Sequence, residues 1–205
     1  GDVERKIREF FQIKEEQAEN AKKTESFNAV RGYVATSISE SIYKMIRYCQ
    51  LEKGIVVIDG DAGIGKTKAA TKFLRDNPAT AIYISTTPST SSVRSLLRMI
   101  SENQRTEDLS ISIRERLRSS DNVLIIDEAQ NLKFMALEEI RGWVDEDPIT
   151  GKPGIGIALI GNDEVYNKML GRQEAIFSQQ FNRTKLHGRY RATNVTKEDV
   201  EKLFP

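Results

Sequence analysis

The residues with the clearest chemistry follow an apolar, β-branched run over 55–58: they are Gly60, Gly65, Lys66 and Thr67. Their spacing is that of a phosphate-binding P-loop between a buried strand and a helix. Glycines let the backbone curl so that successive N–H groups and the helix N-terminus face a phosphate. The lysine then reaches the β- and γ-phosphates, and the threonine hydroxyl suits Mg²⁺. A chance glycine-rich turn is the alternative, but it leaves the flanking strand and helix patterns unexplained.

A second reactive pair follows four consecutive apolar residues, 123–126. Such a run predicts a strand buried on both faces of a parallel sheet, with Asp127 and Glu128 at its carboxyl end, where ligands bind in open α/β sheets. We predict that Asp127 binds Mg²⁺, directly or through water. Glu128 is predicted to accept a proton from the attacking water or to orient it. An acidic helix cap is the alternative, although the upstream P-loop makes the pair specific.

A third polar position, Asn162, follows the next predicted strand, 155–160. At the tip of a strand beside the acidic one, its side chain would position the lytic water or sense the γ-phosphate. An Asx turn that starts the next helix is compatible with both roles. The predicted cofactors are ATP and Mg²⁺, with Thr67 and Asp127 as metal ligands. The predicted nucleotide contacts are Gly60, Asp61, Ala62, Gly63, Ile64, Gly65, Lys66, Thr67 and Lys68.

Hydrophobic periodicity predicts the elements that position these groups. Helices are expected upstream of the P-loop, with Ser37 or Ser39 as N-cap, and after it as far as Asn77. Another strand is expected over 81–84, and more helices over 93–100, over 110–119 and around Trp143. This alternation predicts one P-loop α/β domain, a three-layer sandwich with a central parallel sheet and the nucleotide at the carboxyl ends of the strands.

Composition limits the classes of protein that remain. Among 205 residues, 31 Lys and Arg against 30 Asp and Glu leave a formal net charge of +1, so any surface for nucleic acid must be local. Cys49 is the single cysteine and lies in an apolar helical pattern. We expect it to be a buried small hydrophobe, which fits a reducing, cytoplasmic setting. No apolar run approaches the roughly 18 residues that span a bilayer, so no membrane partner is predicted.

Two segments have a composition suited to phosphate contacts. Residues 85–92 are rich in hydroxyl side chains, with Arg94 and Arg98 close behind. Such side chains supply sequence-independent contacts to DNA, but a solvated loop with a helix N-cap explains them equally well. The segment 168–191 is the one locally basic region. It is either a solvated face or the source of a guanidinium that acts on a neighbouring subunit's nucleotide. His187 has no partner visible in the sequence, and we treat it as structural.

The ordered set of motifs resembles that of AAA+ ATPases. Residues 60–67 resemble the Walker A loop, 123–128 the Walker B strand and Asn162 the sensor-1 residue. Arg183 falls where the family carries its arginine finger, and Arg172 is the competing position. Within the family, three segments are similar to the MuB and TnsC type of transposition ATPase: 81–97, the sequence Leu-Ile-Ile-Asp-Glu-Ala-Gln, and the sequence Leu-Ile-Gly-Asn-Asp.

The resemblance implies a homo-oligomer, ring or helical filament, that assembles with ATP on duplex DNA without sequence preference and activates a transposase at the target site. The expected DNA contacts are Thr87, Ser89, Ser91, Arg94 and Arg105. A replication initiator, helicase loader or clamp-loader-like ATPase shares every core motif and stays an alternative. A small-molecule kinase would share the P-loop, and a further alternative is a binding module that holds ATP as structural glue and barely turns over.

The predicted domain organisation has three parts. Residues 1–26 form a charged N-terminal helix or arm, and 27–194 form the nucleotide-binding core. Residues 195–205 begin a helical lid that the sequence truncates, opened by a loose capping box from Thr196 to Asp199. The family's lid carries a sensor-2 arginine, and MuB-type proteins can carry an N-terminal helix-turn-helix domain. Here we expect a short charged helix before the core, and the sequence ends where the lid is expected to begin.

Overall fold

The computed structural model describes residues 32–101, 109–118, 121–170 and 184–204. It contains two compact units, one formed by Ala35–Thr196 and one by Gly1–Val34 with Lys197–Pro205. The second unit includes helix α9 (Lys197–Leu203). The arm predicted over 1–26 lies outside the described residues, and the lid over 195–205 stays a prediction. All of the residues discussed below as a site belong to the Ala35–Thr196 unit.

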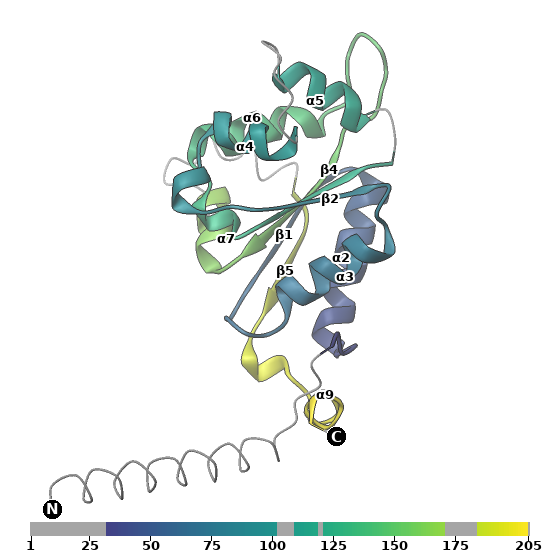
Figure 1. Ribbon diagram of the computed structural model, residues 1–205, viewed down its shortest axis with the longest axis vertical. Coiled ribbons are helices and arrows are strands. Elements are labelled where there is room, and N and C mark those ends of the chain that lie inside the picture. The colour runs from purple at the N-terminus through teal and green to yellow at the C-terminus, as the bar shows by residue number, and fades with distance from the viewer. Residues whose placement is uncertain (1–31, 102–108, 119–120, 171–183, 205) are drawn as a thin grey trace, which may run out of the picture. The chain divides into compact units, whose positions relative to one another are not determined.

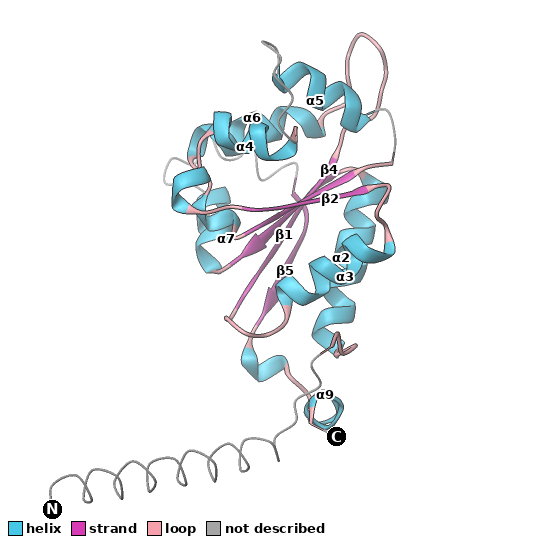
Figure 2. Cartoon of the chain, in the orientation of Figure 1, coloured by secondary structure: helices cyan, strands magenta, loops and turns pink. Residues whose placement is uncertain are grey.

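The centre of the Ala35–Thr196 unit is a β-sheet (Figures 1 and 2). It has five strands in the order β2-β3-β4-β1-β5. All four strand pairings are parallel. The strands are β1 (Gly54–Gly60), β2 (Ala81–Ser85), β3 (Val123–Asp127), β4 (Gly156–Gly161) and β5 (Thr184–Tyr190). The parallel sheet predicted from the buried apolar runs is confirmed. Because β4 pairs with both β1 and β3, the P-loop and the two carboxylates flank the tip of β4.

Helices cover both faces of this sheet (Figure 2). On one face lie α2 (Ser37–Glu52) and α3 (Lys66–Asp76), and on the other lie α4 (Val93–Ile100), α5 (Leu109–Arg118), α6 (Phe134–Val144) and α7 (Asp163–Leu170). Successive strand residues alternate between the two cores: Val56 and Ile58 pack with α2 and α3, whereas Ile55 and Val57 pack with the other group. No helix in the described parts of the chain is long and apolar enough to cross a membrane.

One predicted helix boundary is wrong. Helix α2 begins at Ser37, and its N-cap is Thr36, whose Oγ1 accepts a hydrogen bond from the Ser39 N–H at 3.2 Å. Ser39 itself is buried in the first turn. The sequence offers three hydroxyl residues within four positions, and only the backbone conformation selects one of them, because an N-cap residue must be extended while the next residues are helical.

The environment of Cys49 gives a first test of the packing. The thiol lies on the buried face of α2, and burial raises its pKa to about 12. Since the thiolate is the reactive form, we expect labelling of the native protein by a thiol reagent at pH 8 to be at least about 10³-fold slower than labelling in denaturant. Stopped-flow absorbance with a disulfide reagent measures both rates. Comparable rates in the two conditions would contradict this packing.

Candidate nucleotide-binding site

The P-loop begins where β1 meets the end of β5. A Cβ atom on Gly60 would lie 1.9 Å from the Tyr190 carbonyl oxygen, so only glycine fits at this crossing. Five residues later, Gly65 has φ 97° and caps helix α3 without a side-chain hydrogen bond. The first N–H groups of α3 therefore have no side-chain cap, which is the arrangement that favours a phosphate at a helix N-terminus.

Lys66 lies across the P-loop. Its Nζ donates to the carbonyl oxygens of Gly60 at 2.8 Å and Asp61 at 2.7 Å. An ammonium has three donors, so one remains for a phosphate oxygen. Burial lowers the pKa of Lys66, while the carboxylates of Asp127 and Glu128 oppose that shift. Their negative charges offset part of the cost of holding an ammonium in a partly buried place.

Asp127 is buried at the end of β3 and is hydrogen-bonded to side chains from α3 and β2. Its Oδ2 accepts hydrogen bonds from Thr67 Oγ1 at 2.7 Å and from the Tyr83 hydroxyl at 2.8 Å. Tyr83 was not foreseen. Only strand order could have identified it, because β2 pairs with β3 so that Tyr83 registers with Ile125 and points to the same face as Asp127. Burial and the Asp127 carboxylate raise the pKa of the Tyr83 phenol, which stays a hydrogen-bond donor at neutral pH.

The pair of Thr67 and Asp127 fits a magnesium ion. Hydroxyl and carboxylate oxygens are the ligands that Mg²⁺ prefers, and the two are already in contact. Among the residues that the structure describes, no group of three or more His, Cys, Asp or Glu side chains could hold a metal alone. Mg²⁺ commonly binds through one or two protein oxygens together with waters and substrate phosphates. The pair would thus hold the ion jointly with a nucleotide.

Glu128 follows with an uncommon backbone conformation. Its φ of 54° and ψ of 35° place it in the left-handed region, which costs a non-glycine residue roughly 1 kcal/mol or more. Three contacts hold it there: Thr86 Oγ1 and the Asn131 N–H both donate to its carbonyl, and Gln130 Nε2 donates to its carboxylate. Gln130 lies two residues further along the same sequence motif, so the motif itself carries the signal for this contact. The Glu128 side chain is exposed directly after the end of β3.

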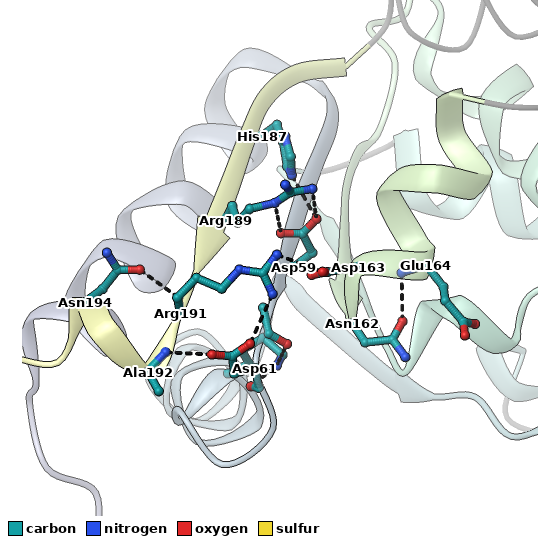
Figure 3. Close-up of polar contacts among 12 residues, drawn as sticks. Asp59, Asp61, Asn162, Asp163, Glu164, His187, Arg189, Arg191, Ala192 and Asn194 are labelled. Carbon is teal, nitrogen blue, oxygen red and sulfur yellow. Dashed lines mark hydrogen bonds and ion pairs between the residues drawn. The ribbon is translucent and has the colours of Figure 1, made fainter.

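Asn162 lies at the tip of β4, next to β3, as predicted. Its Oδ1 accepts the Glu164 N–H at 3.0 Å, which is the Asx turn that starts α7 (Figure 3). The side chain is exposed, and its role toward a nucleotide stays a prediction.

His187, for which the sequence shows no partner, has two partners in the structure. Its Nε2 lies 3.1 Å from Oδ2 of the fully buried Asp59, and its ring stacks on Tyr166 with a centroid distance of 3.7 Å. Arg189 approaches the same Asp59 carboxylate at 3.4 Å. The pairing of β1 with β5 makes these contacts, since Asp59 registers with Arg189. A buried carboxylate at the foot of the P-loop thus has two cationic or hydrogen-bonding partners from one strand.

The basic region over 168–191 is therefore not simply a solvated face. Lys168 Nζ donates to the Gln130 carbonyl, and Arg191 bridges Asp61 and Asp163 (Figure 3). The predicted arginine finger Arg183 and its competitor Arg172 lie outside the described residues. Their role stays a prediction.

The predicted DNA-contact residues fall into three groups. Thr87, Ser89 and Arg94 are exposed around the short helix Pro88–Thr90 and the start of α4. The structure corrects the prediction for Ser91, which is buried and donates its hydroxyl to the Pro88 carbonyl at 2.9 Å. Arg105 lies outside the described residues. The helix N-cap that we offered as the alternative is present: Ser92 Oγ accepts the Ser95 N–H.

Comparison with known proteins identifies the family of this chain. The family model for the AAA domain matches residues 49–169, which include both motif strands and α7. The chain belongs to the AAA domain family. This AAA domain is homologous to the Mu-like prophage FluMu DNA transposition protein B of Haemophilus influenzae, with 31% identity over 83% of the chain and 57% of the relative. The ATP-dependent target DNA activator B of Escherichia phage Mu is 33% identical over 74% of the chain and 49% of its own length. The chain spans about half the length of these relatives.

Among solved structures, Cdc6p from Pyrobaculum aerophilum is similar, with a TM-score of 0.57 at 18% identity over 81% of this chain and 48% of that protein. At this identity the likeness concerns the fold alone. It confirms the AAA+ type of P-loop fold that the motifs predict.

The close crossing at Gly60 makes a testable prediction. In Gly60→Ala the new methyl group would overlap the Tyr190 carbonyl, so β5 must move away from β1. We expect the free energy of unfolding to fall by about 2 kcal/mol or more, measured by urea denaturation.

Gly142→Ala is the matched control. Gly142 is exposed in α6, and a Cβ there meets nothing within 4 Å. This substitution should raise the free energy of unfolding by about 0.5–1 kcal/mol through helix propensity. Equal stability of the two variants would refute the crossing.

Proposed function

We propose that this AAA domain hydrolyses ATP and, as a homo-oligomer on duplex DNA, acts as a target selector and transposase activator of the transposition protein B type. The observation that carries the proposal is the meeting of Lys66 and Thr67 from the P-loop with Asp127 and Glu128 at the end of β3, joined by the 2.7 Å contact of Thr67 and Asp127. The relatives named for DNA transposition and for ATP-dependent target DNA activation support the biological context.

Each of the side chains has a distinct part in the proposed reaction. The P-loop N–H groups and Lys66 bind the phosphates, and Thr67 with Asp127 holds Mg²⁺, which offsets phosphate charge when bound. Glu128 accepts the proton of the attacking water, for which its exposed position at the strand end is suited. Asn162 positions that water from the neighbouring strand. In an oligomer, Arg183 of the adjacent subunit would stabilise the charge that develops on the transferred phosphate.

The proposed DNA surface consists of Thr87, Ser89 and Arg94, with Arg105 as a further contact. The first three are exposed around the short helix Pro88–Thr90 and the start of α4. Hydroxyl and guanidinium groups are typical donors to phosphate oxygens. Contacts of this kind carry no sequence information, which supports binding to duplex DNA without sequence preference. Ser91 is left out of this surface because its hydroxyl is buried.

Glu128→Gln tests the hydrolytic step. The amide is nearly isosteric but cannot accept the proton, so we expect phosphate release to fall by at least about 10²-fold while ATP binding and ATP-dependent assembly persist. Phosphate release with and without duplex DNA, together with light scattering, measures both properties. In a small-molecule kinase the same change would instead alter transfer to a second substrate.

Arg183→Ala is the companion variant. It should bind ATP like the wild type and lose hydrolysis only in the assembled state, because the guanidinium acts on a neighbour. A wild-type protein that stays monomeric with ATP and DNA, and whose hydrolysis ignores DNA, would refute the oligomeric proposal and leave the nucleotide site in place.

Salt dependence tests the DNA surface. If phosphates dominate, the logarithm of the affinity should fall linearly with the logarithm of the salt concentration, at about 0.9 per neutralised phosphate. Arg94→Ala should reduce that slope by about one and weaken binding to all sequences alike, measured by fluorescence anisotropy. Arg75→Ala is the matched control, since Arg75 is an exposed arginine on α3, across the sheet. Binding that does not respond to salt would overturn the proposal.

A further inference from the structure

Arg191 links two segments that border the nucleotide site (Figure 3). Directly after β5, its guanidinium contacts Asp61 Oδ1 of the P-loop at 3.1 Å through one nitrogen. Through the other nitrogen it contacts Asp163 Oδ2 at 2.7 Å, and Asp163 is the first residue of α7. The planar fork of an arginine suits two carboxylates at once, which a lysine ammonium does not match.

The first of these segments is tied to β5 by more than the ion pair. The Asp61 N–H donates to the Tyr190 carbonyl at 3.0 Å, and Asp61 Oδ2 accepts the Ala192 N–H at 2.7 Å. The Ala192 N–H, and then the Arg191 guanidinium, hold the pKa of Asp61 below its usual range, so this carboxylate is charged at neutral pH. Contacts with residues 190–192 therefore fix the position of Asp61, the second residue of the P-loop.

The second segment carries the predicted water-positioning side chain. Asp163 adjoins Asn162, whose Oδ1 is fixed by the Glu164 N–H in the turn that starts α7. A guanidinium that holds Asp163 thereby holds the start of α7, and with it the backbone of Asn162. One arginine spans the phosphate-binding loop and the strand tip from which the water would be positioned.

The charges nearby strengthen the case for a role toward phosphate. Asp59, Asp61 and Asp163 place three carboxylates beside a loop built for a polyanion. Three side chains at alternate positions from β5 to its exit face these carboxylates: His187 and Arg189 both contact Asp59, and Arg191 contacts Asp61 and Asp163. Without Arg191, two of the carboxylates would repel the phosphates.

Stability alone does not account for the bridge. The Arg191 side chain is 36% exposed, and its partners Asp61 and Asp163 are 38% and 42% exposed. Solvent screening and the loss of side-chain entropy leave exposed ion pairs of this kind with little effect on folding stability. The geometric effect, two segments held by one rigid group, is the larger consequence.

We propose that Arg191 is a positioning residue for ATP turnover: it neutralises Asp61 and Asp163 and holds the P-loop in register with the Asn162 turn. This inference rests on the proposed ATPase function. Its role is exercised through the two carboxylates and does not require contact with the nucleotide.

Arg191→Met, Arg191→Lys and the surface control Arg75→Met test the proposal in the full chain. ATP affinity is measured by equilibrium titration, and kcat by phosphate release. We expect Arg191→Met to weaken ATP binding and to lower kcat by about tenfold each. Arg191→Lys should recover the affinity, since the charge is restored, but not kcat, since one ammonium does not grip both carboxylates. Arg75→Met should match the wild type.

A double-mutant comparison shows whether Arg191 acts through its partners. In an Asp61→Asn/Asp163→Asn background, Arg191→Met should change affinity and kcat by less than about twofold. An effect that stays tenfold in this background would mean direct contact with the nucleotide and would overturn the proposal. Thermal melting of each variant separates loss of folding from loss of function. If Arg191→Met alone unfolds, the effect of Arg191→Met is compared in the Asp61→Asn/Asp163→Asn protein instead.

Two failures are distinguishable. If the wild type does not bind ATP, or if Lys66→Ala binds it equally well, the proposed function fails and this inference fails with it. If the wild type binds and hydrolyses ATP, Lys66→Ala does not bind it, and Arg191→Met equals the wild type in both measurements, the inference alone is overturned.

Discussion

The backbone of Gly60 passes so close to the Tyr190 carbonyl that no side chain fits between them, and the rest of the site depends on this approach. A Cβ there would lie 1.9 Å from the carbonyl oxygen. The same crossing allows the Asp61 N–H to bond Tyr190 at 3.0 Å, so the P-loop leaves the sheet from a point that β5 defines. From that point the chain turns through Gly65 into α3, and Lys66 and Thr67 arrive beside the end of β3.

Carboxylates surround the phosphate-binding loop, and their negative charges must be balanced by groups other than Lys66, because Lys66 is needed for the phosphates. Two kinds of partner do this here. Asp127 is held by the hydroxyls of Thr67 and Tyr83, whereas Asp59 and Asp61 are faced by basic side chains from β5 and its exit. Within the described parts of the chain, the hydrogen bonds of Lys66 go to the backbone carbonyls of Gly60 and Asp61, which leaves one donor of its ammonium for a phosphate.

The hydroxyl-rich loop and Glu128 belong to one hydrogen-bonded network. Thr86 donates to the Glu128 carbonyl at 2.7 Å, Asn131 Nδ2 donates to the Thr86 carbonyl at 3.0 Å, and the Lys133 N–H donates to the Ser91 carbonyl at 3.0 Å. The left-handed backbone at Glu128 is stable only because such bonds fix it. These hydrogen bonds therefore connect the loop that carries the proposed DNA surface to the segment that carries Glu128.

The sequence by itself determined the strand–loop–helix of the P-loop, the buried strand that ends at Asp127 and the parallel α/β fold, because these depend on local periodicity and on residue types at short spacing. It did not determine the partners of Asp59 and Asp61. Arg191 lies 130 positions from Asp61 in the chain, and only the pairing of β5 with β1 brings them together. For the same reason, the sequence did not reveal the contact of Tyr83 with Asp127 or the burial of Ser91. Side-chain contacts between distant segments follow from strand order and register, which a single sequence leaves open and close packing of the sheet decides.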